Sequence, residues 1–190
     1  SQPPPTDRGT ARTGGGGWRP SLGAWPDDGG ARFRVWAPEV SSLEVVGDRP
    51  GSGPWREALN KDDDGTYSGF VAGLKAGDRY KYLVENRGTF PDPASRFQPE
   101  GPEGPSMVVD PSAFAWTDAG WRGPKAVEGQ ALYELHVGTF TPEGTWAAAG
   151  AELPYLAELG VTAVGPVPVA AGPGPSSRGH AALRPFSPLP

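Results

Sequence analysis

Side chains that could stack on a sugar or move a proton are few in this sequence, and they lie in two separate segments. In the first segment, Trp36, Trp55 and Tyr80 offer aromatic faces of the kind that pack against sugar rings. A tryptophan in a strand of alternating polarity more often packs in the core, so we predict a core position for Trp36. Trp55 follows a Gly/Pro loop, and for this residue core packing and sugar binding remain equal alternatives.

The second segment carries Glu134 and His136, which alternate on one face of a predicted strand. A general-acid role for Glu134 would need a partner carboxylate, and none lies near it in the sequence. His136 is one of two histidines in the chain. A structural, hydrogen-bonding role for His136 is favoured, and contact with a substrate is the alternative.

The run Asn60–Gly65 places oxygen-bearing side chains at the first, third and fifth positions and glycine at the sixth, as a calcium-binding loop does. The twelfth position of such a loop requires a bidentate Glu, and here it is Val71. A hairpin turn ending in Asp-Gly explains the same residues. We therefore predict a hairpin turn and no metal site.

The composition argues against several classes of function. The formal net charge is −5, and no cluster of Lys and Arg exceeds two adjacent residues, so a nucleic-acid partner is not expected. The absence of cysteine excludes disulfides and thiolate metal sites. No run of 18 apolar residues occurs, and the N-terminus lacks a hydrophobic signal region, so we expect no membrane association and a cytoplasmic location. No cofactor is predicted.

The elements that must position these residues fall into four predicted regions. Residues 1–17 are rich in Pro, Gly and Thr and are predicted to be a disordered arm. Residues 18–110 are predicted to form a β-sandwich, residues 111–130 a linker, and residues 131–190 the incomplete start of a (β/α)8 barrel. The fold class is thus mostly β, with an antiparallel sandwich followed by a first βαβ portion.

Short runs with period-two alternation, separated by Gly- and Asp-rich turns, predict the strands of the sandwich. In the clearest of them Phe33 and Val35 are predicted to face the core. A segment with five prolines is predicted to be an irregular strap without regular structure. The predicted strands are residues 31–36, 43–46, 67–71, 79–85 and 106–109, and the predicted strap is residues 90–105.

Residues 132–169 predict two parallel strands joined by a helix. The strands are residues 132–137 and 161–169. The helix is predicted to end at Gly160 and to begin at Pro154 after an irregular Ala/Gly turn, and Thr145 is a possible cap. A complete barrel needs about 250 residues, so this part is predicted to begin a larger unit.

Specific motifs now point to a family. The run FRVWAP at residues 33–38 resembles the N-terminal sandwich of α-amylase-superfamily enzymes. This resemblance implies an immunoglobulin-like β-sandwich of the early-set type. Three further motifs resemble the malto-oligosyltrehalose trehalohydrolase family more specifically. They are FPDPASRFQP at 90–99, VVDP at 108–111 and YELHVGTFTPEGT at 133–145.

The resemblance implies a retaining glycosidase that releases trehalose from maltooligosyl-trehalose, with catalytic Asp, Glu and Asp on later barrel strands. No position here matches one of those carboxylates, so no catalytic residue is carried over. The tail at residues 179–188 is similar to a family segment whose Tyr forms a sugar-stacking platform, and His180 occupies that position. The second barrel strand departs from the family pattern at Gly165 and Pro166, which weaken a central strand.

Three interpretations remain open at this stage. The leading one is the N-terminal part of a trehalohydrolase, inactive alone, with an α-glucan or maltooligosyl-trehalose as the partner. The second is a stand-alone β-sandwich that binds a glucan or a protein partner, and the third is the product of a disrupted gene. The candidate substrate-binding residues are Trp55, His136 and His180.

Overall fold

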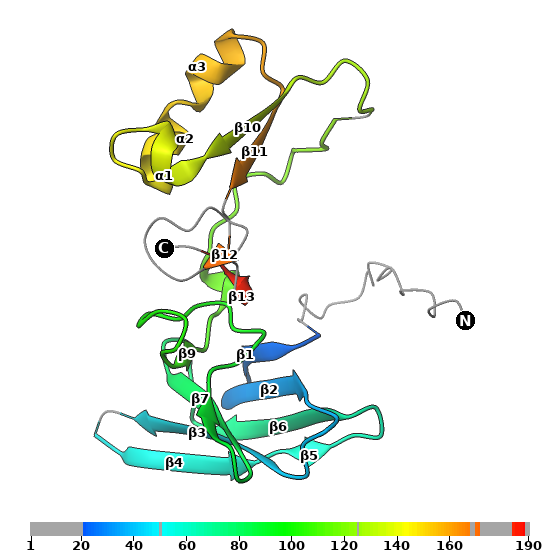
Figure 1. Cartoon of the computed structure of the whole chain (residues 1–190), viewed down its shortest axis with the longest axis vertical. Helices are drawn as coiled ribbons and strands as arrows, with labels where there is room; N and C mark the ends of the chain where they lie inside the picture. Colours follow the sequence, from blue (N-terminus) through cyan, green and yellow to red (C-terminus); the bar gives the residue numbers. More distant parts are fainter. Residues whose placement is uncertain (1–20, 50, 125, 168–169, 172–183, 189–190) are drawn as a thin grey trace.

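The computed structural model describes residues 21–190, except residues 50, 125, 168–169, 172–183 and 189–190. Figure 1 shows an antiparallel β-sandwich and a small α/β unit, joined by an extended segment. The predicted disordered arm at residues 1–17 and His180 lie outside the described residues. The elements are β1 (Gly23–Asp27), β2 (Gly30–Trp36), β3 (Leu43–Arg49), β4 (Gly53–Ala58), β5 (Asn60–Lys61), β6 (Thr66–Ala72), β7 (Arg79–Val84), β8 (Gly88–Phe90), β9 (Ser106–Met107), a 3-10 turn (Pro111–Ala113), β10 (Leu132–His136), α1 (Val137–Phe140), α2 (Trp146–Ala151), α3 (Leu153–Glu158), β11 (Ala163–Val167), β12 (Ala170–Ala171) and β13 (Arg184–Pro188).

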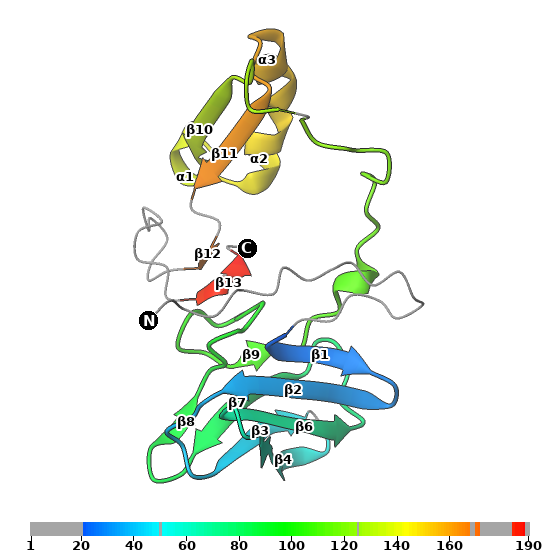
Figure 2. The same ribbon diagram turned by 90° about the vertical axis from the view of Figure 1, so that its right-hand side faces the viewer.

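Two antiparallel sheets form the sandwich, and Figure 2 shows them one behind the other. One sheet has the strand order β1-β2-β6-β5, and the other has the order β4-β3-β7-β8 with β9 paired to β7. The core lies between them, where Phe33 meets Tyr80 edge-on with ring centroids 5.0 Å apart. This architecture confirms the predicted sandwich.

Strand β2 shows the predicted alternation, with one error. Phe33 and Val35 are buried and Arg32 is exposed. The same alternation places Trp36 on the outer face, where 61% of its surface is exposed. The predicted core position of Trp36 is therefore wrong, because a strand that turns residues 33 and 35 inward must turn residue 36 outward. The Trp36 indole nitrogen donates to the Asp64 carbonyl oxygen at 3.3 Å.

The other predicted strands appear as β3, β6, β7 and β9, with ends that differ by up to three residues. On β7, Tyr80 and Tyr82 are buried and Val84 packs against the core. Strands β1, β4, β5 and β8 were not predicted. β1 and β4 contain glycine and proline, which obscure a period-two pattern, and β5 and β8 are too short to show one.

The acidic run after β5 is a hairpin turn, as predicted. The Asp62 amide donates to the Thr66 carbonyl at 2.7 Å, and the Gly65 amide donates to the Asp62 carbonyl at 3.0 Å. The Asp64 carboxylate accepts from the Thr66 amide at 2.8 Å, which lowers its pKa. Among the described residues, no group of three or more His, Cys, Asp and Glu side chains is placed to hold a metal ion.

The strap follows β8 without regular structure, as predicted, but it is fixed at a buried carboxylate. Asp92 Oδ2 accepts from the Tyr80 hydroxyl at 2.6 Å, and Asp92 Oδ1 accepts from the Ala94 amide at 2.7 Å. The Asp92 amide donates to Ser106 Oγ at 2.9 Å. Arg96 donates to the Leu22 and Ala24 carbonyls, which ties the strap to β1. These bonds connect the strap to strands of both sheets.

The α/β unit contains the predicted parallel pair. Leu132 of β10 lies opposite Ala163 of β11, and His136 lies opposite Val167. Pro166 lies within β11 in spite of its missing amide hydrogen, and proline is tolerated where a strand has a free edge. β10 is the one partner of β11 among the described strands.

The connection between these strands differs from the prediction. Three short helices replace the single helix, and the Ala/Gly segment predicted to be irregular is the helix α2. Alanine is the strongest helix former, and Thr145 Oγ1 caps α2 by accepting from the Ala148 amide at 3.2 Å. Pro154 does lie in the first turn of α3, as predicted.

The core of the α/β unit is small. Leu135, Val137 and Leu156 form its buried cluster, whereas Leu132, Tyr155 and Leu159 are exposed. Between the two parts, residues 114–131 contain no helix or strand at their described positions. No described helix is long and apolar enough to cross a membrane.

Candidate functional site

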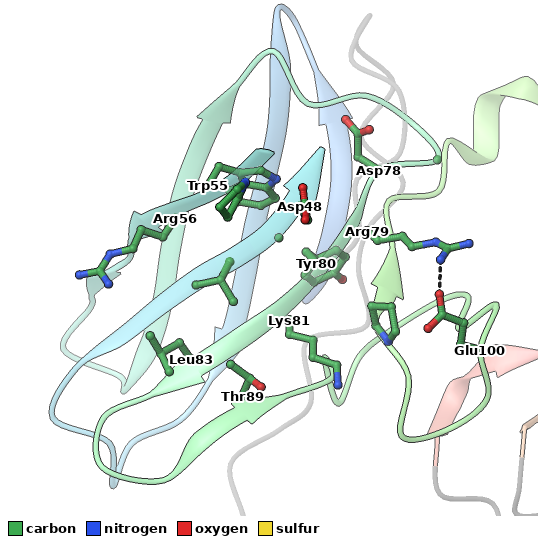
Figure 3. A pocket seen from close by; sticks show the side chains of 15 residues that line it. Asp48, Trp55, Arg56, Asp78, Arg79, Tyr80, Lys81, Leu83, Thr89 and Glu100 are labelled. Carbon is green, nitrogen blue, oxygen red and sulfur yellow. Dashed lines mark hydrogen bonds and ion pairs between the residues drawn. The ribbon is translucent and has the colours of Figure 1, made fainter. Parts of the chain in front are cut away.

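A groove of about 1180 Å³ crosses the β4-β3-β7-β8 sheet. We call it the sheet groove. Strands β3, β4 and β7 line most of it, and Thr89 of β8 and two strap residues, Glu100 and Pro105, complete it. Figure 3 shows these side chains around one concave surface, with Trp55 at one end and Glu100 at another.

Trp55 takes its position from the residue opposite it. It pairs with Gly47 of β3, and a Cβ atom added at Gly47 would lie 2.5 Å from the indole ring. Glycine therefore leaves the space that the indole fills. Trp55 is partly buried and packs against the core, and it also lines the groove. Its contact with a sugar stays a prediction.

Oxygen acceptors beside Trp55 come from residues that the sequence did not single out. Asp48 of β3 and Asp78, just before β7, both line the groove. Asp62 to Asp64 are near Trp55 in the sequence, but they lie in the hairpin after β5, on the other sheet, and do not line the groove.

Basic side chains in the groove are engaged by neighbouring groups. Arg56 pairs with Glu44, with Nε and Oε2 3.1 Å apart. Arg79 forms an ion pair with Glu100, drawn as a dashed line in Figure 3. Lys81 Nζ donates to the Glu103 carbonyl at 3.1 Å. The groove thus combines an aromatic wall, carboxylate acceptors and cations held by neighbouring groups, which suits a hydroxyl-rich ligand.

His136 lies at the end of β10, in the α/β unit and therefore apart from Trp55. Both of its ring nitrogens are buried and have no hydrogen-bond partner among the described residues. The role of His136, structural or in substrate contact, stays a prediction. Glu134 is exposed and lies opposite Gly165 in the parallel pair, so no carboxylate from β11 stands beside it.

The comparison with protein families identifies the sandwich. Residues 21–113 match the family model described as Carbohydrate-binding module 48 (Isoamylase N-terminal domain). Residues 21–113 therefore resemble the N-terminal module of α-amylase-family enzymes, as the motifs at residues 33–38 and 90–99 indicated.

Curated relatives narrow the resemblance. Malto-oligosyltrehalose trehalohydrolase from Rhizobium sp. (strain M-11) is 38% identical over 178 residues, which is 89% of this chain and 28% of the relative. The enzyme of the same name from Deinococcus radiodurans is 42% identical over 171 residues, covering 85% of this chain and 26% of the relative. The chain thus spans about a quarter of the length of these relatives, and it matches the N-terminal portion of the malto-oligosyltrehalose trehalohydrolases.

Solved structures agree with this assignment. A crystal structure of a candidate alpha amylase from Salmonella typhimurium has a TM-score of 0.79 and 38% identity, covering 90% of this chain and 28% of that one. A pullulanase from Bacillus acidopullulyticus has a TM-score of 0.73 and 25% identity, covering 88% of this chain and 25% of that one. Both matches extend past the sandwich, so they include the α/β unit.

Proposed function

We propose that the chain is the N-terminal part of an enzyme that hydrolyses maltooligosyl-trehalose and releases trehalose. The observation that carries the proposal is the parallel pairing of β10 with β11 after the sandwich, since a (β/α)8 barrel begins with such a unit. On this proposal residues 18–110 are the sandwich module, residues 111–130 are the linker and residues 131–190 are the incomplete start of the barrel. The trehalohydrolase resemblance supports the choice of substrate.

The chain alone is expected to be inactive. A retaining glycosidase uses two carboxyl groups about 5–5.5 Å apart. Glu134 faces no carboxylate across the β10–β11 pair, because its register partner is Gly165. The two catalytic carboxyl groups would therefore come from later barrel strands. Incubating the chain with maltooligosyl-trehalose should release no trehalose, and release that is lost in Glu134→Gln would contradict this account.

A chimera tests the proposed substrate directly. In it, this chain replaces the matched segment of the Deinococcus radiodurans relative, which is 26% of that enzyme. The expected result is release of trehalose from maltooligosyl-trehalose, because the sandwich and the first parallel strands would support the relative's catalytic strands. The relative itself is the positive control. A folded chimera without trehalose release would refute the proposal.

Within this enzyme, we assign the sheet groove to binding of an α-glucan chain. The partly buried Trp55 offers an aromatic surface for a sugar ring, and Asp48 and Asp78 offer oxygens to sugar hydroxyl groups. The match of residues 21–113 to a carbohydrate-binding module supports this assignment. A stand-alone binding module is less favoured, because the resemblance to the trehalohydrolases continues beyond the sandwich.

Calorimetric titration with maltoheptaose tests the groove. Trp55→Ala should weaken binding by at least about fivefold, the loss expected when an aromatic contact of about 1 kcal/mol is removed. Trp36→Ala is the matched control, since Trp36 is exposed on the other sheet and does not line the groove. Calorimetry is preferred because replacing a tryptophan also alters the fluorescence. Equal affinity of the two variants for maltoheptaose would contradict a glucan-binding site in the sheet groove.

A further inference from the structure

Two cations of β7 lie side by side in the sheet groove. Arg79 and Lys81 are two residues apart on one strand, so they share a face, and both line the groove. One turn of the strap holds both of them. Arg79 pairs with the Glu100 carboxylate, and Lys81 Nζ donates to the Glu103 carbonyl at 3.1 Å. The turn therefore neutralises Arg79, and it engages one N–H of Lys81, which keeps its charge.

The turn that presents Glu100 is braced from inside. Gln98 is buried, and its side-chain nitrogen donates to the Pro102 carbonyl at 2.9 Å. The Gly101 amide donates to the Gln98 carbonyl at 3.1 Å, and the Gly104 amide donates to the Gly101 carbonyl at 2.9 Å. Glu100 is thus held on a preformed turn beside Arg79, and the ion pair does not depend on a mobile loop.

We propose that Glu100 is a specificity residue that excludes phosphate-bearing glucans from the sheet groove. The inference rests on the proposed glucan-binding function of that groove. With Glu100 in place, Arg79 is neutralised, and Asp48 and Asp78 add negative charge to the same surface. Arg56 is paired with Glu44, so the carboxylates Asp48, Asp78 and Glu100 outnumber the two remaining cations, Arg79 and Lys81. A phosphorylated sugar therefore meets net repulsion in the groove. Removing the charge of Glu100 leaves Arg79 available to a phosphate group.

The test compares two matched variants of the full chain. Glu100→Gln removes the charge that faces Arg79 and keeps the shape of the side chain. Glu103→Gln removes an equal charge from the same turn, but only the backbone of Glu103 contacts the groove. Each protein is titrated with maltoheptaose and with maltoheptaose bearing one 6-phosphate. Low salt, about 50 mM, keeps charge interactions measurable.

Glu100→Gln should bind the phosphorylated ligand about fivefold more tightly than wild type, the scale expected for an ion pair whose side chains are half exposed. Its affinity for maltoheptaose should not change. Glu103→Gln should match wild type with both ligands. Equal affinity of the two variants for the phosphorylated ligand would overturn the proposal, whatever their affinity for maltoheptaose. One outcome separates the two proposals: maltoheptaose does not bind, but Glu100→Gln binds the phosphorylated ligand more tightly than wild type. This outcome would refute the proposed glucan site and support the proposed role of Glu100.

Discussion

Asp92 gives the sharpest test of how the strap is held on the sandwich. Its side chain is fully buried and accepts hydrogen bonds from the Tyr80 hydroxyl and the Ala94 amide. Asp92→Ala removes both acceptors. A buried donor left without a partner costs about 1–3 kcal/mol. Two donors lose their partner, but Asp92→Ala also removes the free-energy cost of burying a carboxylate, which offsets part of the loss. The free energy of unfolding should therefore fall by about 2–4 kcal/mol.

The loss should depend on pH in a defined direction. Burial is the main cause that raises the pKa of Asp92, and the hydrogen bonds from Tyr80 and Ala94 oppose it. A carboxyl group whose pKa is raised by folding stabilises the native state most below its unfolded pKa, about 3.9, and this contribution is lost as the pH rises through its folded pKa. The difference between wild type and Asp92→Ala should therefore be larger near pH 4 than near pH 7.

Urea unfolding of the full chain, followed by circular dichroism, measures the effect at both pH values. Asp92→Asn is the matched control, because its amide oxygen still accepts one hydrogen bond but the side chain does not titrate. It should cost about 1 kcal/mol. A loss in Asp92→Ala that grows from pH 4 to pH 7 would refute the reasoning, since it would mean that the charge attraction to Arg96 outweighs burial.

Two further predictions concern the groove and the linker. Gly47→Ala should weaken maltoheptaose binding by about fivefold or more, because the added Cβ would displace the indole of Trp55. The control is Gly120→Ala, whose added Cβ meets no atom within 4 Å. This control should bind maltoheptaose as tightly as wild type. Limited proteolysis should first cut between residues 111 and 131, whose described positions carry no β-strand and where Trp116 and Trp121 are exposed. Mass spectrometry should then find a sandwich fragment that resists further cleavage. A single protected species covering both parts would show that they dock firmly.

The alternation of apolar and polar residues predicted the sandwich strands well where one face of a strand is buried and the other is exposed to solvent. Strands β2 and β7 are the clearest cases, because alternate residues of each lie in the core. The same rule, followed one residue further along β2, would have placed Trp36 outside. Strand β4 lacked such a pattern, since Pro54 and Arg56 are exposed and Trp55 is only partly buried.

The groove itself could not be predicted from local sequence. Its residues come from β3, β4, β7 and the strap, which the fold brings together from positions 46 to 105. Trp55 was identified by its residue type, but its acceptors and the neutralisation of Arg79 depend on pairing between distant segments. The sequence motifs predicted the family correctly, because motifs can be compared with a known family without knowledge of the fold. They did not locate the groove.

The strap shows why a segment without regular structure can still position a functional side chain. A loop is mobile when few of its backbone and side-chain groups are engaged. Here Asp92 fixes the strap where it leaves β8, and Gln98 braces the turn that presents Glu100. The five prolines that identified this segment in the sequence limit its freedom further, because proline fixes one backbone angle. Because the strap is held in this way, Glu100 already pairs with Arg79 in the free protein. A charged ligand would therefore meet this ion pair when it first enters the groove.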